Sequence, residues 1–224
     1  KTIQHGFESG RIQVRGMIIS NYSFEYSHFD AAGSLHTWLQ ENDIPGIYGI
    51  DTRELTKTLR TTGVMLGRIT TEPGEDTLDI IDPNETDLAG MVGVKEPVIY
   101  SPKKNKNPKK ILLIDCGVKN NIIRNFVNRG AEVIRVPLGY DPMSSEYEFD
   151  GIFVSNGPGD PKMCTATIDN LKRSFSLNKP IFGICLGSQI LGLSAGADTY
   201  KLKFGHRSQN QPCIEVGGHC YITS

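Results

Sequence analysis

One cysteine of this 224-residue chain stands where a thiol could act as a nucleophile. Cys185 lies in "FGICLGSQ", where Gly183 and Gly187 flank it at two-residue spacing and a short apolar run changes to helical spacing. The pattern predicts a strand, a tight turn and a helix, which is a nucleophile elbow of the form G-x-C-x-G. The dipole and free N–H groups of a helix N-terminus favour a thiolate. The alternative is that Cys185 is a small buried apolar residue, as most free cysteines are.

A second segment, "SNGPGDP" at 155–161, predicts a rigid loop that is nearly free of side chains. The backbone N–H groups around Gly157 and Gly159 could therefore face a substrate. A plain turn would also use this sequence, and that alternative stays open. Beside a cysteine elbow on a neighbouring strand, however, the loop becomes a candidate oxyanion hole and substrate cradle.

The elements that would hold these two segments follow a regular alternation. Near-continuous apolar runs with crossover helices indicate a buried, mostly parallel sheet, in which ligands bind at the carboxyl ends of the strands. Cys185 and the loop should then share one edge. We expect strands at 111–115, 131–137, 151–157 and 181–185, and helices at 120–130, 167–177 and 186–196.

The first part of the chain predicts a smaller α/β unit without a catalytic cluster of its own. We expect strands at 11–19, 44–50 and 64–70, and helices at 34–42 and 53–63, the second capped by Asp51 or Thr52.

The lysine-rich segment "SPKKNKNPKK" at 101–110 indicates a solvated linker. We therefore expect an N-terminal domain at 1–102, a linker at 103–109 and a second domain at 110–224. A nuclear-localisation or nucleic-acid patch is the disfavoured alternative.

Composition limits the class of protein. A net charge of −1 indicates no nucleic-acid partner, and no apolar stretch approaches the roughly 20 residues of a membrane span. Five cysteines without a C-x-x-C pair favour a reducing, cytoplasmic compartment. A metal site is disfavoured because the spacings match no common zinc pattern. Its candidate ligands would be Cys213, Cys220, His206 and His219.

The motifs together resemble a known family. "SNGPGDP", "GICLGSQ", "KLKFGHR" and "NQP" are similar to the class I glutamine amidotransferase domain of carbamoyl-phosphate synthase, and "LLIDCGVKNNIIR" to the strand and helix that open it. "IDTRELTKTLR" and "GRI" resemble the preceding N-terminal domain of the glutaminase subunit. The resemblance implies a flavodoxin-like amidotransferase domain, incomplete at its C-terminus. "NQPC" and "TRELTK" lean toward the eukaryotic enzyme of pyrimidine synthesis, which is often fused into a multienzyme.

The resemblance also implies roles for residues. Cys185 matches the nucleophile that forms a γ-glutamyl thioester, and the N–H groups of Leu186 and Gly157 match the oxyanion hole. Gln189 and Gly159 match substrate contacts.

Two further positions are less settled by the resemblance. Lys119 matches a basic residue near the site, with a structural salt bridge as its equal alternative. Ser188 departs from the histidine common in the family, which affects a neighbouring polar contact.

The family's catalytic histidine and glutamate are expected beyond Ser224, and a serine contact before Lys1, so that a fragment of this length should be inactive alone. His206 and His219 are disfavoured as substitutes for the base.

The resemblance implies no cofactor in this domain. ATP, Mg²⁺ and bicarbonate would be used by a partner synthetase domain or subunit, which receives ammonia from glutamine. The alternatives are another class I amidotransferase, or a non-catalytic regulatory module.

Overall fold

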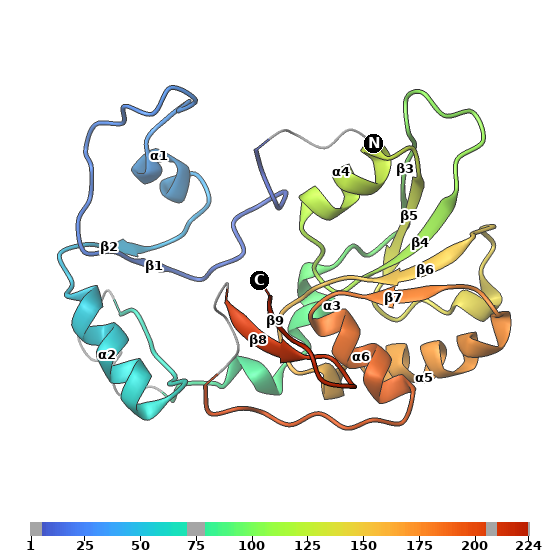
Figure 1. Ribbon diagram of the computed structural model, residues 1–224. Coiled ribbons are helices and arrows are strands. Elements are labelled where there is room, and N and C mark those ends of the chain that lie inside the picture. The colour runs from blue at the N-terminus through green and yellow to red at the C-terminus, as the bar shows by residue number, and fades with distance from the viewer. Residues whose placement is uncertain (1–5, 71–78, 205–209, 224) are drawn as a thin grey trace.

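A five-stranded sheet forms the main body of the protein (Figure 1). The computed structural model describes residues 6–70, 79–204 and 210–223. The strand order is β3-β5-β4-β6-β7; β3 is antiparallel to β5 and the other pairs are parallel. The parallel strands therefore follow the flavodoxin-like order, which confirms the expected fold class. The strands are β3 (Val98–Tyr100), β4 (Lys110–Asp115), β5 (Glu132–Pro137), β6 (Gly151–Val154) and β7 (Ile181–Gly183).

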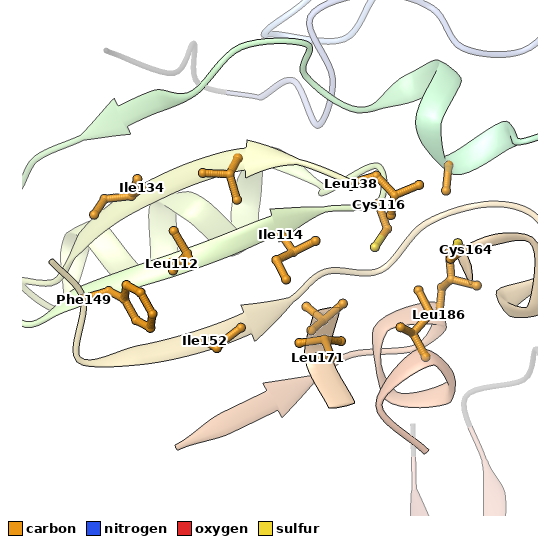
Figure 2. Packing of buried hydrophobic residues seen from close by; sticks show 14 residues of the cluster. Leu112, Ile114, Cys116, Ile134, Leu138, Phe149, Ile152, Cys164, Leu171 and Leu186 are labelled. Atoms are coloured by element: carbon orange, nitrogen blue, oxygen red, sulfur yellow. The ribbon is translucent and has the colours of Figure 1, made fainter. Parts of the chain in front are cut away.

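Helices cover both faces of this sheet. Helix α4 (Asn120–Asn128) packs Ile123 against Leu113, while α5 (Thr165–Ser174) and α6 (Leu186–Ser194) pack on the face of Leu112 and Ile114 (Figure 2). Alternate residues of β4 thus enter two different cores, and all of these apolar side chains are fully buried. This burial explains why the strand reads as an uninterrupted apolar run.

The strands and helices expected after residue 110 are all present, but four short elements were not predicted. They are β3, helix α3 (Leu88–Val92) and the antiparallel hairpin of β8 (Gln211–Ile214) and β9 (Cys220–Thr223). Three-residue β3 and five-residue α3 are too short for a hydrophobic period to show. The hairpin could have been predicted from the pair Gly217 and Gly218, because hairpin turns favour glycine where φ is positive, and both residues have positive φ in this turn.

The first part of the chain has the small α/β arrangement that was expected. β1 (Met17–Ile18) pairs in parallel with β2 (Gly46–Ile47) across helix α1 (Leu35–Gln40), and α2 (Thr52–Thr62) follows. Asp51 caps α2 by accepting a hydrogen bond from the N–H of Glu54 at 2.9 Å. Single 3₁₀ turns occur at Pro83–Glu85, Pro142–Ser144, Pro161–Met163 and Phe175–Leu177.

The strand expected at 64–70 is wrong. These residues are described, and they form no strand. The apolar side chains that suggested it, Val64, Met65 and Leu66, are about half exposed. An apolar run becomes a strand only where a neighbouring strand satisfies its backbone, and no such partner pairs with it among the described residues.

The lysine-rich segment at 103–109 connects two strands of the same sheet, β3 and β4. Ala89 of α3 is also buried in the core beneath that sheet. The division into 1–102 and 110–224 stays a prediction. The pairing of β3 with β5 favours an earlier division, and we propose that the second domain begins before α3.

Within the described ranges, no helix has both the length and the apolar character needed to cross a bilayer.

Replacement of Tyr100 tests whether β3 belongs to the sheet. Tyr100 is 4% exposed and packs in the same buried cluster as Ile123 of α4. Tyr100→Ala should therefore lower the free energy of unfolding by about 3 kcal/mol. Tyr26→Ala removes the same side chain from a position that is 56% exposed and should cost no more than about 0.5 kcal/mol. Urea unfolding of both variants is the measurement, and equal effects would contradict the placement of β3.

Candidate active site

Cys185 lies at the turn between β7 and α6 in a conformation that few residues adopt. Its φ is 54° and its ψ is −115°, and it is the N-cap residue of α6 without a side-chain capping bond. The carbonyl oxygen of Cys185 accepts hydrogen bonds from the N–H groups of Ser188 at 3.0 Å and Gln189 at 3.2 Å. Cys185 is exposed. The alternative that it is a buried apolar residue is therefore wrong.

The flanking glycines are required by close backbone contacts. A Cβ on Gly183 would lie 2.5 Å from the carbonyl carbon of Gly187, and a Cβ on Gly187 would lie 2.1 Å from the carbonyl oxygen of Val154. Neither position can hold another residue without movement of backbone. The two glycines therefore allow the first turn of α6 to pack directly against the end of β6, and Cys185 between them remains exposed.

The glycine loop begins where β6 ends, beside that turn. A Cβ on Gly157 would lie 1.9 Å from the carbonyl oxygen of Cys116, which follows β4. Gly159 has a φ of 94°. Among the described residues, none accepts a hydrogen bond from the N–H groups of Gly157, Gly159 or Leu186. Three donors thus remain available near the carboxyl ends of β6 and β7. Their assignment to an oxyanion hole and substrate contacts stays a prediction.

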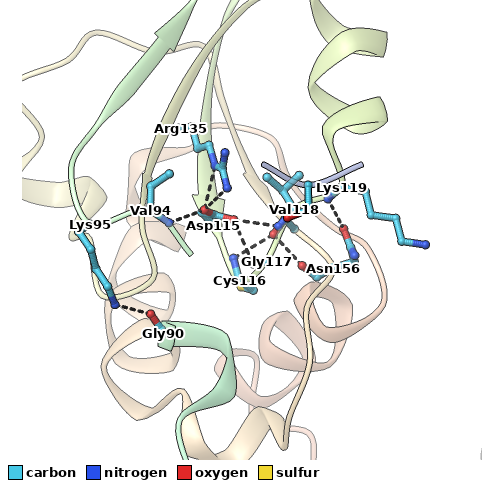
Figure 3. Close-up of polar contacts among 12 residues, drawn as sticks. Gly90, Val94, Lys95, Asp115, Cys116, Gly117, Val118, Lys119, Arg135 and Asn156 are labelled. Carbon is cyan, nitrogen blue, oxygen red and sulfur yellow. Dashed lines mark hydrogen bonds and ion pairs between the residues drawn. The ribbon is translucent and has the colours of Figure 1, made fainter. Parts of the chain in front are cut away.

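A buried polar network lies under the loop, and sequence reasoning missed it (Figure 3). Asp115 is fully buried at the end of β4 and pairs with Arg135 at 2.6 Å. Ser155, also fully buried, accepts a hydrogen bond from the N–H of Cys116 at 2.9 Å and donates one to the carbonyl of Asn156 at 2.9 Å. Both Asp115 and Ser155 could have been found from the sequence, because each is a polar residue at the end of an apolar run that predicts a buried strand.

The remaining expected residues are more peripheral. Gln189 is exposed one turn after Cys185. Lys119 is exposed; its backbone N–H donates to Asn156 at 3.4 Å, and the described part of the chain offers its side chain no ion pair. Ser188 donates its hydroxyl to the carbonyl of Cys185 at 2.7 Å. At the position where the family commonly has a histidine, this chain thus makes a local contact through Ser188.

Of the two disfavoured histidines, only His219 lies within the described residues. His219 lies in the β8–β9 turn with its ring tilted toward Tyr221, and His206 lies outside the described residues. In the ranges that the structure describes, no three histidine, cysteine or acidic side chains come together as metal ligands.

The other four cysteines differ from Cys185 either in exposure or in their place in the fold. Burial raises the pKa of Cys164 to about 11, with Asp87 and Asp160 adding to the shift. Burial also raises the pKa of Cys116. Both thiols are therefore protonated at neutral pH. Cys213 and Cys220 are exposed, but they lie in the β8–β9 hairpin and not at a helix N-terminus.

Two family models match the chain. A family model described as "Glutamine amidotransferase class-I" matches residues 112–223, and one described as "Carbamoyl-phosphate synthase small chain, CPSase domain" matches residues 2–69.

Curated relatives match the whole chain. The carbamoyl phosphate synthase arginine-specific small chain of Saccharomyces cerevisiae is 45% identical over 97% of this chain and 54% of its own length. The multifunctional protein CAD of Squalus acanthias is 45% identical over 99% of this chain and 10% of its own length. The multifunctional protein pyr-3 of Neurospora crassa is 43% identical over 100% of this chain and 14% of its own length.

The chain thus spans about half of that small chain and a small part of the multifunctional proteins. The two family models nevertheless match in the order that the motifs predicted. The chain belongs to the class I glutamine amidotransferase family, and within it to the group in which a carbamoyl-phosphate synthase small chain domain precedes the amidotransferase domain.

Proposed function

We propose that this chain is the glutamine-hydrolysing part of a carbamoyl-phosphate synthase and supplies ammonia to a synthetase domain. The observation that carries the proposal is the exposed Cys185 at the N-terminus of α6, held at positive φ. The N–H groups of Leu186 and Gly157 lie at the ends of the neighbouring strands and are available as donors. The two family matches support glutamine as the substrate and a synthetase as the partner.

The proposed reaction has two halves. The Cys185 thiolate attacks the side-chain carbonyl carbon of glutamine, forming a C–S bond while the carbonyl electrons move onto oxygen. The N–H groups of Leu186 and Gly157 stabilise that oxyanion. Its collapse breaks the C–N bond, and the nitrogen takes up the proton that the Cys185 thiol lost on forming the thiolate and leaves as ammonia. Water then attacks the γ-glutamyl thioester, releasing glutamate and restoring the thiol. Gly159 and Gln189 contact the substrate.

The proposed partner is a carbamoyl-phosphate synthetase domain, which receives the ammonia by channelling and uses ATP, Mg²⁺ and bicarbonate. The relatives favour two arrangements, a separate small chain and a multifunctional protein. We propose pyrimidine synthesis in the cytoplasm as the setting, on the resemblance of "TRELTK" and "NQPC". The arginine-specific small chain, of equal identity, makes arginine synthesis the second candidate. The proposal includes no cofactor in this domain, and neither a nucleic-acid nor a membrane partner.

Two alternatives receive less support. Another class I amidotransferase is disfavoured by the match of residues 2–69 to the small chain domain. A non-catalytic module is disfavoured because Cys185 keeps the exposed elbow and Gln189 remains one turn away.

Alkylation tests the special position of Cys185. In the longer protein that contains this chain, a glutamine-mimicking electrophile at pH 7 should label Cys185 at least about 10-fold faster than any other cysteine, because a thiolate at a helix N-terminus is the reactive species. Cys116 and Cys164 should react slowest, since burial raises the pKa of both. Mass mapping measures the rates. Equal labelling of exposed Cys213 or Cys220 would remove the reason for choosing Cys185.

An added methyl group tests the glycine loop. Gly157→Ala places a Cβ against the carbonyl of Cys116, so the loop must move and its N–H must leave the oxyanion position. We expect glutaminase kcat to fall on the order of 10²-fold. Gly139→Ala is the matched control at the same sheet edge, because its Cβ would meet no atom within 4 Å. Full activity in Gly157→Ala would place the oxyanion hole elsewhere, with Gly159 as the next candidate.

A serine in place of the nucleophile separates the two activities of the complete enzyme. Cys185→Ser keeps the elbow but provides a far weaker nucleophile, so glutamine-dependent carbamoyl phosphate synthesis should be lost. Synthesis from added ammonia should remain within about 2-fold of the unchanged enzyme, because the ammonia-using chemistry lies in the synthetase. Both rates are measured on assembled enzyme. Retention of both would mean that Cys185 is not the nucleophile, and loss of both would give it a structural role.

A further inference from the structure

The fully buried carboxylate of Asp115 is surrounded by hydrogen-bond donors. One oxygen, Oδ1, accepts from the N–H groups of Gly117 at 3.0 Å and Val118 at 2.8 Å. The other, Oδ2, accepts from the N–H of Val94 at 2.7 Å and from Arg135 at 2.8 Å. Figure 3 shows these contacts converging on the end of β4. None of the partners is an acceptor, so only an ionised carboxylate satisfies them all.

The bonds to Oδ1 fix the turn that supports Gly157. They hold Gly117 at a φ of 116° and leave the carbonyl of Cys116 against Gly157, where a Cβ would lie 1.9 Å from that oxygen. A Cβ on Gly117 would in turn lie 3.1 Å from Cδ of Pro158. The turn and the glycine loop thus touch through backbone and a proline ring, so a shift of the turn must move the loop.

The bond to Oδ2 fixes the support of Gly159. Val94 follows α3, and a Cβ on its neighbour Gly93 would lie 2.7 Å from the carbonyl oxygen of Asp115. At the start of α3, Cβ of Leu88 lies 3.4 Å from where a Cβ of Gly159 would be. The Asp115 carboxylate therefore links the turn at 116–118, which lies against Gly157, with helix α3, which lies against Gly159.

We propose that Asp115 is a positioning residue for glutamine hydrolysis: its carboxylate locks the turn at 116–118 and the end of α3, and these hold Gly157, with its N–H toward the oxyanion, and Gly159 beside it. The inference rests on the proposed function, because the loop acts as an oxyanion hole only if Cys185 attacks glutamine. Asp115 acts through other residues and touches no reacting atom.

The exchange of one oxygen for an amide tests this role in the complete enzyme. Asp115→Asn turns an NH₂ group toward backbone N–H or Arg135, so the supports of the loop should loosen. We expect glutaminase kcat to fall about 10- to 100-fold, with KM for glutamine within about 3-fold. Alkylation of Cys185 by iodoacetamide, which needs no oxyanion hole, should stay within about 2-fold. Amide exchange should rise in peptides covering 153–160 and stay unchanged at 183–190.

The matched control is Asp150→Asn. Asp150 precedes β6 at the opposite edge of the sheet and accepts from Lys109 at 2.9 Å and from the N–H of Lys110 at 2.8 Å. It is remote from the loop along the strand, so this variant should keep kcat and the exchange of 153–160. If loss of folded enzyme were the cause, kcat would fall in each variant in proportion to the fall in its free energy of unfolding. Positioning instead predicts a loss of kcat in Asp115→Asn alone.

Unchanged kcat and unchanged exchange in Asp115→Asn would overturn the proposal. If that variant is insoluble, Arg135→Lys decides, because it removes the Nε donor from Oδ2 but keeps the positive charge. It should lower kcat about 3- to 10-fold with the same pattern of exchange, and unchanged values would overturn the proposal equally. Failure of the proposed function looks different: the unchanged enzyme would then hydrolyse no glutamine, or Cys185→Ser would retain the activity, whatever the exchange of 153–160.

Discussion

The arrangement at the carboxyl edge of the sheet depends on backbone segments that touch so closely that neither contact leaves room for a Cβ. Gly187 lies on the carbonyl of Val154, and Gly157 lies on the carbonyl of Cys116. These contacts join the ends of three neighbouring parallel strands, β4, β6 and β7, into one surface. Because parallel strands end together, segments that are 30 to 70 residues apart in sequence meet there without any long loop.

Cys185 is held in a strained conformation by the packing of the helix that follows it. A non-glycine residue at positive φ costs about 1 to 3 kcal/mol, which the surroundings must offset. Directly after it, Leu186 and Ile190 of α6 are almost completely buried against the sheet, and each such side chain contributes about 1.5 to 3 kcal/mol. The packed helix therefore fixes the turn, and the cysteine is left exposed above the helix N-terminus.

The sequence was sufficient for what depends on neighbours in the chain. The period of the apolar residues gave the four parallel strands and their helices, and the glycine spacing gave the elbow. It was insufficient for contacts between distant residues. Val94 and Arg135 each lie about 20 residues from Asp115, on either side, and no local pattern pairs them. The short β3 likewise exists because β5 offers an open edge, and 64–70 is not a strand because no described strand pairs with it.

The first part of the chain reaches this edge through one further contact. Helix α4 begins just after the turn at 116–118, and its N-cap residue, Lys119, makes no side-chain capping bond. Glu8 supplies the cap instead: its carboxylate accepts from the N–H of Asn121 at 2.8 Å and from Arg124 at 2.6 Å. Since the N–H of Lys119 donates to Asn156 in the glycine loop, a continuous chain of contacts runs from Glu8 to that loop. The first part of the chain is thus connected through hydrogen bonds to the glycine loop, in which we propose an oxyanion donor.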